Sequence, residues 1–245
     1  YELLQNADDA EATKASFDLY EDKLVFKHNG KRHFSVSNPL TEDEDSKRGT
    51  LGDINSITSI ANSNKTEAKI GKFGIGFKAV FQYTSTPIIY DPNYRFRIER
   101  FIVPVIINED YEGRKADETV FIFPFNHKVK SAKDAYEDIS EKLCSLTYPL
   151  LFLKTMNEVD LFIGNRPLGK YSKNIVNRFH FGDIDCEYIC LTNIHQGKSV
   201  DSNLWLFTKS IFSLNISVGF FVNDKGQLTP VHEFAFCFFP TKEIT

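Results

Sequence analysis

Three glycines within six residues, at positions 71, 74 and 76, constrain this chain more than any other feature. They stand in Ile-Gly-Lys-Phe-Gly-Ile-Gly-Phe, residues 70–77, directly before an apolar pattern of helical spacing. Glycine lets the backbone approach a ligand closely and, with a helix N-terminus, turns N–H groups toward an anion. The segment is compatible with an anion-contacting loop, although a glycine triplet alone does not identify one. A polar stretch precedes it, which disfavours a Rossmann fold, and Phe73 after Lys72 disfavours a P-loop.

The first residues supply a second chemical pattern. Glu2, Asn6 and Asp9 lie four and three residues apart, so a helix places all three on roughly one face. The amide oxygen of Asn6 could join a Mg²⁺ shell without adding a charge that repels a triphosphate. Glu2, one turn away, could accept a proton from an attacking water. An exposed polar helix face with no ligand is the alternative reading of this pattern alone.

Composition limits the classes of partner. A formal charge of −4 gives no broad basic field, so a nucleic-acid partner is compatible with the chain but not indicated. No apolar run approaches the roughly 18 residues of a membrane span, and we expect no membrane. The four cysteines form no C-x-x-C pair, which favours reduced thiols in a cytoplasmic protein. Because Tyr1 leads straight into a helical pattern, we also expect an excerpt of a longer chain.

Periodicity predicts alternating helices and strands. We expect helices over residues 1–16 and 51–61, from the glycine cluster to about 84, and from Ser131, where an apolar stripe follows a capping box. Residues 35–50 have no periodicity and predict an irregular surface segment, with the acidic run at 42–45 on a solvated face. The expected strands are 24–28, 88–90, 96–98, 103–107, 120–125, 158–163, 186–192, 203–208, 217–223 and 233–239. Phe121, Phe123 and Phe125 predict a core strand, and His28 and His33 predict structural or solvent-facing roles.

Four segments together resemble one family. Residues 2–10, Glu-Leu-Leu-Gln-Asn-Ala-Asp-Asp-Ala, resemble the first box of GHKL (Bergerat-fold) ATPases, closest to sacsin-type proteins and the ninety-kilodalton heat-shock chaperones. Residues 59–65, 70–81 and 117–124 resemble the family's later segments, in family order. The resemblance implies a Bergerat-type α/β sandwich with a mixed sheet over residues 1–127. A smaller transducer-like α+β region would follow over residues 128–245.

The resemblance also implies site roles. Glu2 would be the general base, Asn6 the Mg²⁺ ligand and Asp9 a neighbour of the ATP. Thr119 would lie under the adenine. The expected nucleotide contacts near the lid and in the glycine loop are Gly30, Ser63, Lys65, Gly71, Lys72, Phe73, Gly74, Ile75, Gly76 and Phe77.

One position departs from the family pattern. Relatives place an Asp after the second strand to accept a hydrogen bond from the adenine amino group, and this chain has Asn29 there. We expect the amide oxygen of Asn29 to accept that bond, without the strengthening that a charge gives. Lys31 and Arg32 replace small residues of the family next to it.

The implied function is Mg²⁺-dependent ATP binding and slow hydrolysis. Lid closure would then drive a conformational switch in a larger protein, with a homodimer in the ATP-bound state and flanking domains as further partners. A nucleotide-binding interaction module that does not hydrolyse ATP is the alternative.

Overall fold

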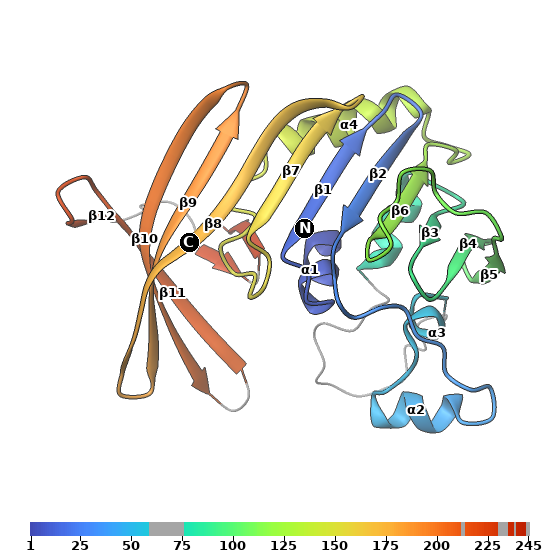
Figure 1. Ribbon diagram of the computed structural model, residues 1–245, viewed down its shortest axis with the longest axis horizontal. Helices are drawn as coiled ribbons and strands as arrows, with labels where there is room; N and C mark the ends of the chain where they lie inside the picture. The colour runs from blue at the N-terminus through green and yellow to red at the C-terminus, as the bar shows by residue number, and fades with distance from the viewer. Residues whose placement is uncertain (59–75, 212–213, 230–234, 238, 244–245) are drawn as a thin grey trace.

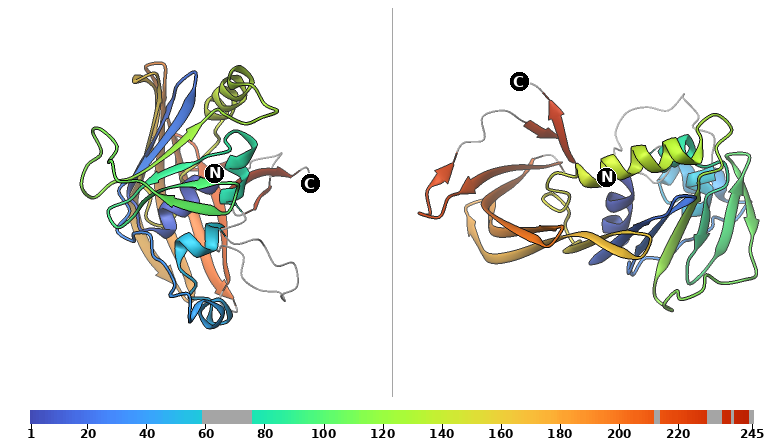
Figure 2. Two further views of the ribbon diagram at one scale, coloured as in Figure 1. Left: turned by 90° about the vertical axis from the view of Figure 1, so that its right-hand side faces the viewer. Right: turned by 90° about the horizontal axis from the view of Figure 1, so that it is seen from above.

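The computed structural model describes residues 1–58, 76–211, 214–229, 235–237 and 239–243. It is a mixed α/β structure in which one long sheet is accompanied by a few helices (Figure 1). Helices α1 and α4 lie on the same face of that sheet (Figure 2). The helical elements are α1 (Glu2–Asp9), α2 (Glu42–Arg48), α3 (Asp53–Thr58), the 3₁₀ helix η1 (Phe77–Gln82) and α4 (Ala132–Cys144). None of the described helices has the length and apolar character that a bilayer crossing requires.

The main sheet has 12 strands in the order β12-β11-β10-β9-β8-β7-β1-β2-β6-β3-β4-β5. Their bounds are β1 (Lys14–Leu19), β2 (Lys23–His28), β3 (Ile88–Tyr90), β4 (Arg95–Glu99), β5 (Val103–Ile106), β6 (Thr119–Pro124), β7 (Glu158–Ile163), β8 (Arg166–Phe181), β9 (Ile184–His195), β10 (Lys198–Ile211), β11 (Leu214–Val222) and β12 (Leu228–Thr229). A separate two-stranded sheet pairs β13 (Ala235–Cys237) with β14 (Phe239–Glu243). β1 pairs with β7 in parallel, and the other described neighbours are antiparallel. The sheet therefore continues across residue 127.

Aromatic packing fills the core between the first half of the sheet and its helices. Phe26 of β2 packs on Phe17 of β1 at 4.7 Å and on Phe121 of β6 at 5.8 Å between ring centroids. Phe77, at the start of η1, reaches the same cluster. Rings at these separations add to the free energy of burial. β6 is buried from Thr119 to Phe123, which agrees with the core strand expected there.

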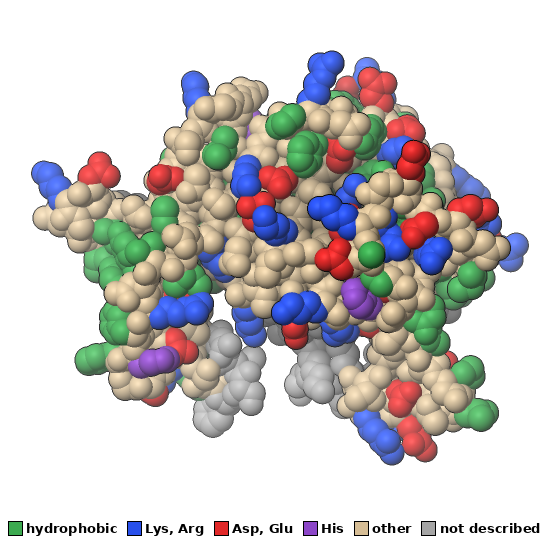
Figure 3. All heavy atoms as spheres, in the orientation of Figure 1, with side chains coloured by type: hydrophobic (Ala, Val, Ile, Leu, Met, Phe, Trp, Pro, Cys, Tyr) green, Lys and Arg blue, Asp and Glu red, His purple; other side chains and the backbone are tan. Residues whose placement is uncertain are grey.

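A smaller core lies under strands β8 to β11. It consists of Leu151, Ile189, Leu191, Leu204 and Leu206. The opposite face of these strands carries linked aromatic rings, including Trp205 and Phe220, with Val218 about half exposed. Hydrophobic side chains gather over this end of the molecule (Figure 3).

Most predicted elements are present, and α4 begins as expected, with the hydroxyl of Ser131 accepting from Asp134 N. The expected helix over 1–16 is wrong beyond Asp9. Glu11 takes a left-handed φ of 59°, and alternating burial of Ala15, Phe17 and Leu19 turns the chain into strand β1.

Two further expectations need correction. Residues 35–50 contain helix α2, where acidic residues open the helix and Lys47 and Arg48 close it before left-handed Gly49, an arrangement that suits the helix dipole. Its lack of buried residues agrees with the solvated face expected there. Strand β8 was not predicted, because residues 176–181 are exposed on both faces and show no alternation.

Candidate functional site

Helix α1 brings two predicted site residues together. Leu4 and Ala7 bury its apolar side, so its polar side faces the start of η1. There the carboxylate of Glu2 lies against Gly76, where an added Cβ would stand 1.8 Å from Glu2 Oε2. Only glycine permits this approach without moving the acid. Phe77, the next residue, is 1% exposed and anchors the junction in the core.

Gly71, Lys72, Phe73, Gly74, Ile75, Ser63 and Lys65 lie outside the described residues.

Asn6 lies one turn after Glu2 and carries an unsatisfied group. Its Nδ2 atom is buried and has no hydrogen-bond partner in the part of the chain that the structure describes. A buried donor without a partner costs about 1–3 kcal/mol, so such groups are uncommon away from ligand sites. Asp9, at the end of the same face, is exposed. Although the residue is exposed, neighbouring groups partly shield its carboxyl group from water, and this desolvation, with the nearby charge of Asp8, raises the pKa of Asp9.

Asp8 has a structural role that sequence reasoning missed. Its carboxylate accepts hydrogen bonds from the backbone N–H groups of Lys154, Thr155 and Met156 and from the Thr155 hydroxyl, at 2.7–2.9 Å. These bonds lower the pKa of Asp8 against the opposing effect of burial. α1 is thus fixed on one side to the segment that leads into β7, while its other side presents Glu2 and Asn6.

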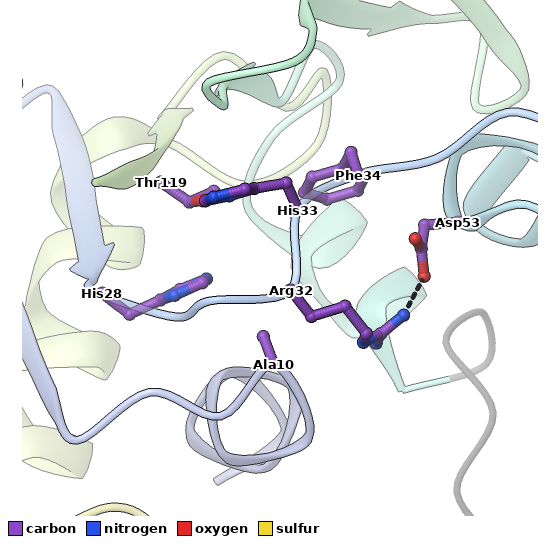
Figure 4. Close-up of a pocket in the computed structure, with 7 residues that line it drawn as sticks. All are labelled: Ala10, His28, Arg32, His33, Phe34, Asp53 and Thr119. Carbon is purple, nitrogen blue, oxygen red and sulfur yellow. Dashed lines mark hydrogen bonds and ion pairs between the residues drawn. The ribbon is translucent and has the colours of Figure 1, made fainter. Parts of the chain in front are cut away.

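A small cavity of about 10 Å³ lies beyond the C-terminal end of α1 (Figure 4). Its lining comes from the residue that follows α1, the end of β2, the loop after β2, α3 and the start of β6. The residues are Ala10, His28, Arg32, His33, Phe34, Asp53 and Thr119. Arg32 forms a 2.8 Å ion pair with Asp53, which ties the loop after β2 to α3.

Asp91 stands behind this cavity and was not among the expected site residues. It is fully buried, and its Oδ2 accepts a 2.7 Å hydrogen bond from the Thr119 hydroxyl. Its Oδ1 accepts from the backbone N–H of Phe34 at 3.2 Å. His33 Nδ1 lies 3.4 Å from Asp91 Oδ2 without the alignment of a hydrogen bond. An Asp directly after strand β3, before Pro92, was the only local signal for this position.

The side-chain amide of Asn29 is hydrogen-bonded to the segment that follows α1. Its Oδ1 accepts from the backbone N–H groups of Thr13 and Lys14 at 3.0 and 2.9 Å, and its Nδ2 donates to the Thr13 hydroxyl. Both acceptor positions of the amide oxygen are therefore in use. Gly30 packs tightly beside it, since an added Cβ would lie 2.8 Å from the carbonyl oxygen of Ala10.

His28 is a buried, neutral histidine, in line with the structural role expected for it. Its Nδ1 accepts from the backbone N–H of Gly30 at 3.1 Å, which places the ring proton on Nε2. Burial, together with nearby His33, lowers the pKa of His28 to about 4.

Comparisons with known proteins find sequence similarity in the N-terminal part of the chain, which carries most of this site. Residues 1–98 match the model of the Sacsin domain family. An alignment over 113 residues, covering 38% of this chain, is 35% identical to human sacsin. This part of the chain is sacsin-like. The chain spans 2% of the length of human sacsin. Glu2, Asn6 and Gly76 fall within the matched Sacsin domain, and Thr119 falls outside it.

Proposed function

We propose that the protein binds Mg²⁺-ATP between α1 and the glycine segment that ends at Gly76. It would hydrolyse the nucleotide slowly and use it to switch conformation, as a GHKL-type ATPase. The observation that carries this proposal is the contact of the Glu2 carboxylate with Gly76, with the unpaired amide of Asn6 one turn away. The sacsin-like sequence over residues 1–98 supports it.

The residues present fit a magnesium nucleotide. No cluster of three or more His, Cys, Asp or Glu side chains in the described ranges is arranged to hold a metal by itself. Magnesium commonly takes one or two protein ligands and completes its shell with phosphate and water. Asn6 Oδ1 would be the protein ligand, and its unpaired N–H would donate to a phosphate oxygen. When bound, the ion would offset charge on the phosphates.

Glu2 would act as the general base. It is exposed at the start of α1, and its position against Gly76 would put it at the phosphate end of the nucleotide. A carboxylate there can orient a water and accept its proton. Because Gly76 has no Cβ, the carboxylate can lie this close to the backbone at the end of the glycine segment.

The adenine ring of the nucleotide would lie at the small cavity beside Thr119. The Thr119 hydroxyl donates its hydrogen bond to Asp91, which leaves the hydroxyl oxygen free to accept a hydrogen bond from an adenine amino group. Thr119 and Asp91 would thereby replace the family's carboxylate, since the oxygen of Asn29 is engaged. A cavity of about 10 Å³ holds one water and not a purine ring. The loop carrying His33 and Phe34 therefore has to move outward when the nucleotide enters.

Calorimetry and phosphate release test the proposal. We expect Mg²⁺-ATP binding by the wild type and slow phosphate release that disappears in Glu2→Ala, while that variant still binds. Glu21→Ala, at an exposed acid in the turn between β1 and β2, serves as the control and should keep both. Absence of heat at millimolar ATP would contradict the proposal.

The second candidate is a nucleotide-binding module without hydrolysis. It differs from the first in the phosphate release that it predicts for the wild type. It is favoured if ATP binds but phosphate release by the wild type is no faster than by Glu2→Ala. The amide oxygen of Asn29 already accepts two backbone hydrogen bonds, so recognition of the adenine differs from the family pattern. This difference favours the second candidate. Dimerisation on ATP binding is part of the first candidate and can be followed by light scattering with and without a non-hydrolysable analogue.

A further inference from the structure

A second, larger cavity lies away from the proposed nucleotide site. Its volume is about 270 Å³, close to the lower end of the range for small-molecule pockets, which is roughly 300–1,000 Å³. One wall is the segment of residues 146–150 after α4. The other wall is formed by strands β8, β9 and β10.

The strand register determines which side chains line the sheet wall of the cavity. Asn193 of β9 pairs with Tyr171 of β8 and Val200 of β10, and two residues away Leu191 pairs with Ser202. Alternation along the strands puts these five side chains on one face. The wall therefore combines two aliphatic side chains and an aromatic ring with an amide and a hydroxyl.

The amide on this wall has an unsatisfied acceptor. Asn193 Oδ1 is buried and has no hydrogen-bond partner among the described residues. A ligand that donates an N–H or O–H to it would remove the cost of that unpaired group. Asn193 lines the cavity, so a turn of its amide toward the cavity would offer this oxygen to a ligand donor beside the apolar surface.

No charged side chain lines the cavity among its described residues. A phosphate or carboxylate entering it would lose its hydration without gaining a counter-charge. Lys173 of β8 is paired with Leu191 of β9, but its ammonium group does not line the cavity. It donates to the carbonyl oxygen of Leu153. The site thus disfavours anions and differs in kind from the proposed ATP site.

The opposite wall is held in place by hydrogen bonds from two tyrosines. The Tyr171 hydroxyl donates to the carbonyl of Leu146 at 3.0 Å. The Tyr1 hydroxyl accepts from the backbone N–H of Thr147 and donates to its carbonyl, both at 3.1 Å. Tyr148 takes a left-handed φ of 44°, a costly conformation for a non-glycine residue that the anchored segment maintains. A fixed wall reduces the entropy lost on binding.

We propose that this cavity binds an uncharged ligand group that combines an aromatic or aliphatic ring with a hydrogen-bond donor directed at Asn193. The ligand is of the size of a bicyclic ring. The site is independent of nucleotide, so its occupation does not require that the ATP proposal hold.

Indole and two relatives of it are the probes. Indole carries a ring N–H, 1-methylindole has the same ring without the donor, and indole-3-carboxylate adds a negative charge. Titrations are followed by methyl NMR of Leu146, Leu150, Leu191 and Val200, which line the cavity. We expect saturable shifts with indole and binding about fivefold weaker with 1-methylindole, the effect of one neutral hydrogen bond. The carboxylate should not bind.

Three variants decide the outcome. Val200→Trp fills the cavity and should abolish the saturable shifts of the remaining methyl groups. Val218→Trp, on the opposite face of the sheet, is the matched control and should leave them unchanged. Asn193→Leu should erase the difference between indole and 1-methylindole. Shifts that rise without saturation, that persist in Val200→Trp, or that favour the carboxylate would overturn the proposal.

Discussion

Removing the Asp8 carboxylate should destabilise the protein strongly. It accepts three backbone N–H bonds and one hydroxyl bond from residues 154–156, so Asp8→Ala leaves the three N–H groups unpaired, while the Thr155 hydroxyl keeps the carbonyl of Ala12 as an acceptor. Bonds to a charged group contribute about 1.5–3 kcal/mol each, and the site is only half buried, so we expect a total loss of about 3–4 kcal/mol of unfolding free energy. Asp8→Asn keeps one accepting oxygen and should lose about half as much.

The assay is urea denaturation followed by circular dichroism. Asp9→Ala is the matched control, because it removes the neighbouring exposed carboxylate from the same helix and should stay within about 0.5 kcal/mol of the wild type. Because the pKa of Asp8 is lowered in the folded state, its contribution is present at neutral pH and is lost as the pH falls through that lowered pKa. A loss in Asp8→Ala no larger than in Asp9→Ala would refute the reasoning.

The remaining predictions concern buried and crowded groups. His28 has a lowered pKa of about 4, so the unfolded chain takes up the proton first and stability should fall by up to about 3 kcal/mol between pH 6.5 and 4. Denaturation of His28→Leu should lack this fall, whereas His180→Leu, at an exposed site, should keep it. Burial lowers the pKa of Lys173 to about 8, so stability should rise with pH between 8 and 10.5, and Lys173→Met should not show the rise. Gly76→Ala should push the flexible Glu2 side chain aside, leaving the melting temperature nearly unchanged but weakening ATP binding in calorimetry.

Local sequence signals predicted those elements whose stabilising contacts are local. β2 is a short apolar run ended by a turn dipeptide, and α4 has its cap and its apolar stripe within its own residues. α2 also carried local signals, since acids open it and left-handed Gly49 ends it, but its full exposure gave no periodicity to detect.

The misassigned elements depend on distant partners. Residues 10–16 have good helix formers, yet β1 forms because it pairs with β7, more than a hundred residues later. Tertiary pairing of this kind overrides helix propensity, which is worth less than about 1 kcal/mol per residue. β8 likewise forms through its pairing with β9, although half of it is exposed on both faces.

The site residues also fall into those that local spacing predicted and those that depend on distant partners. The spacing of Glu2 and Asn6 on one helix predicted their shared face, and the structure puts Glu2 beside Gly76. Asp91 was missed because its partner Thr119 is 28 residues away and nothing in the sequence near either residue links them. The oxygen of Asn29 was expected to be free, and only the return of the chain after α1 brings it the two backbone donors.

The most direct test of the central claim is a crystal structure with Mg²⁺ and a non-hydrolysable ATP analogue. The account predicts the triphosphate beside Glu2, Asn6 and Gly76, with the base next to Thr119 and the loop carrying His33 displaced. An analogue bound elsewhere, or none at saturating concentration with α1 unchanged, would contradict it.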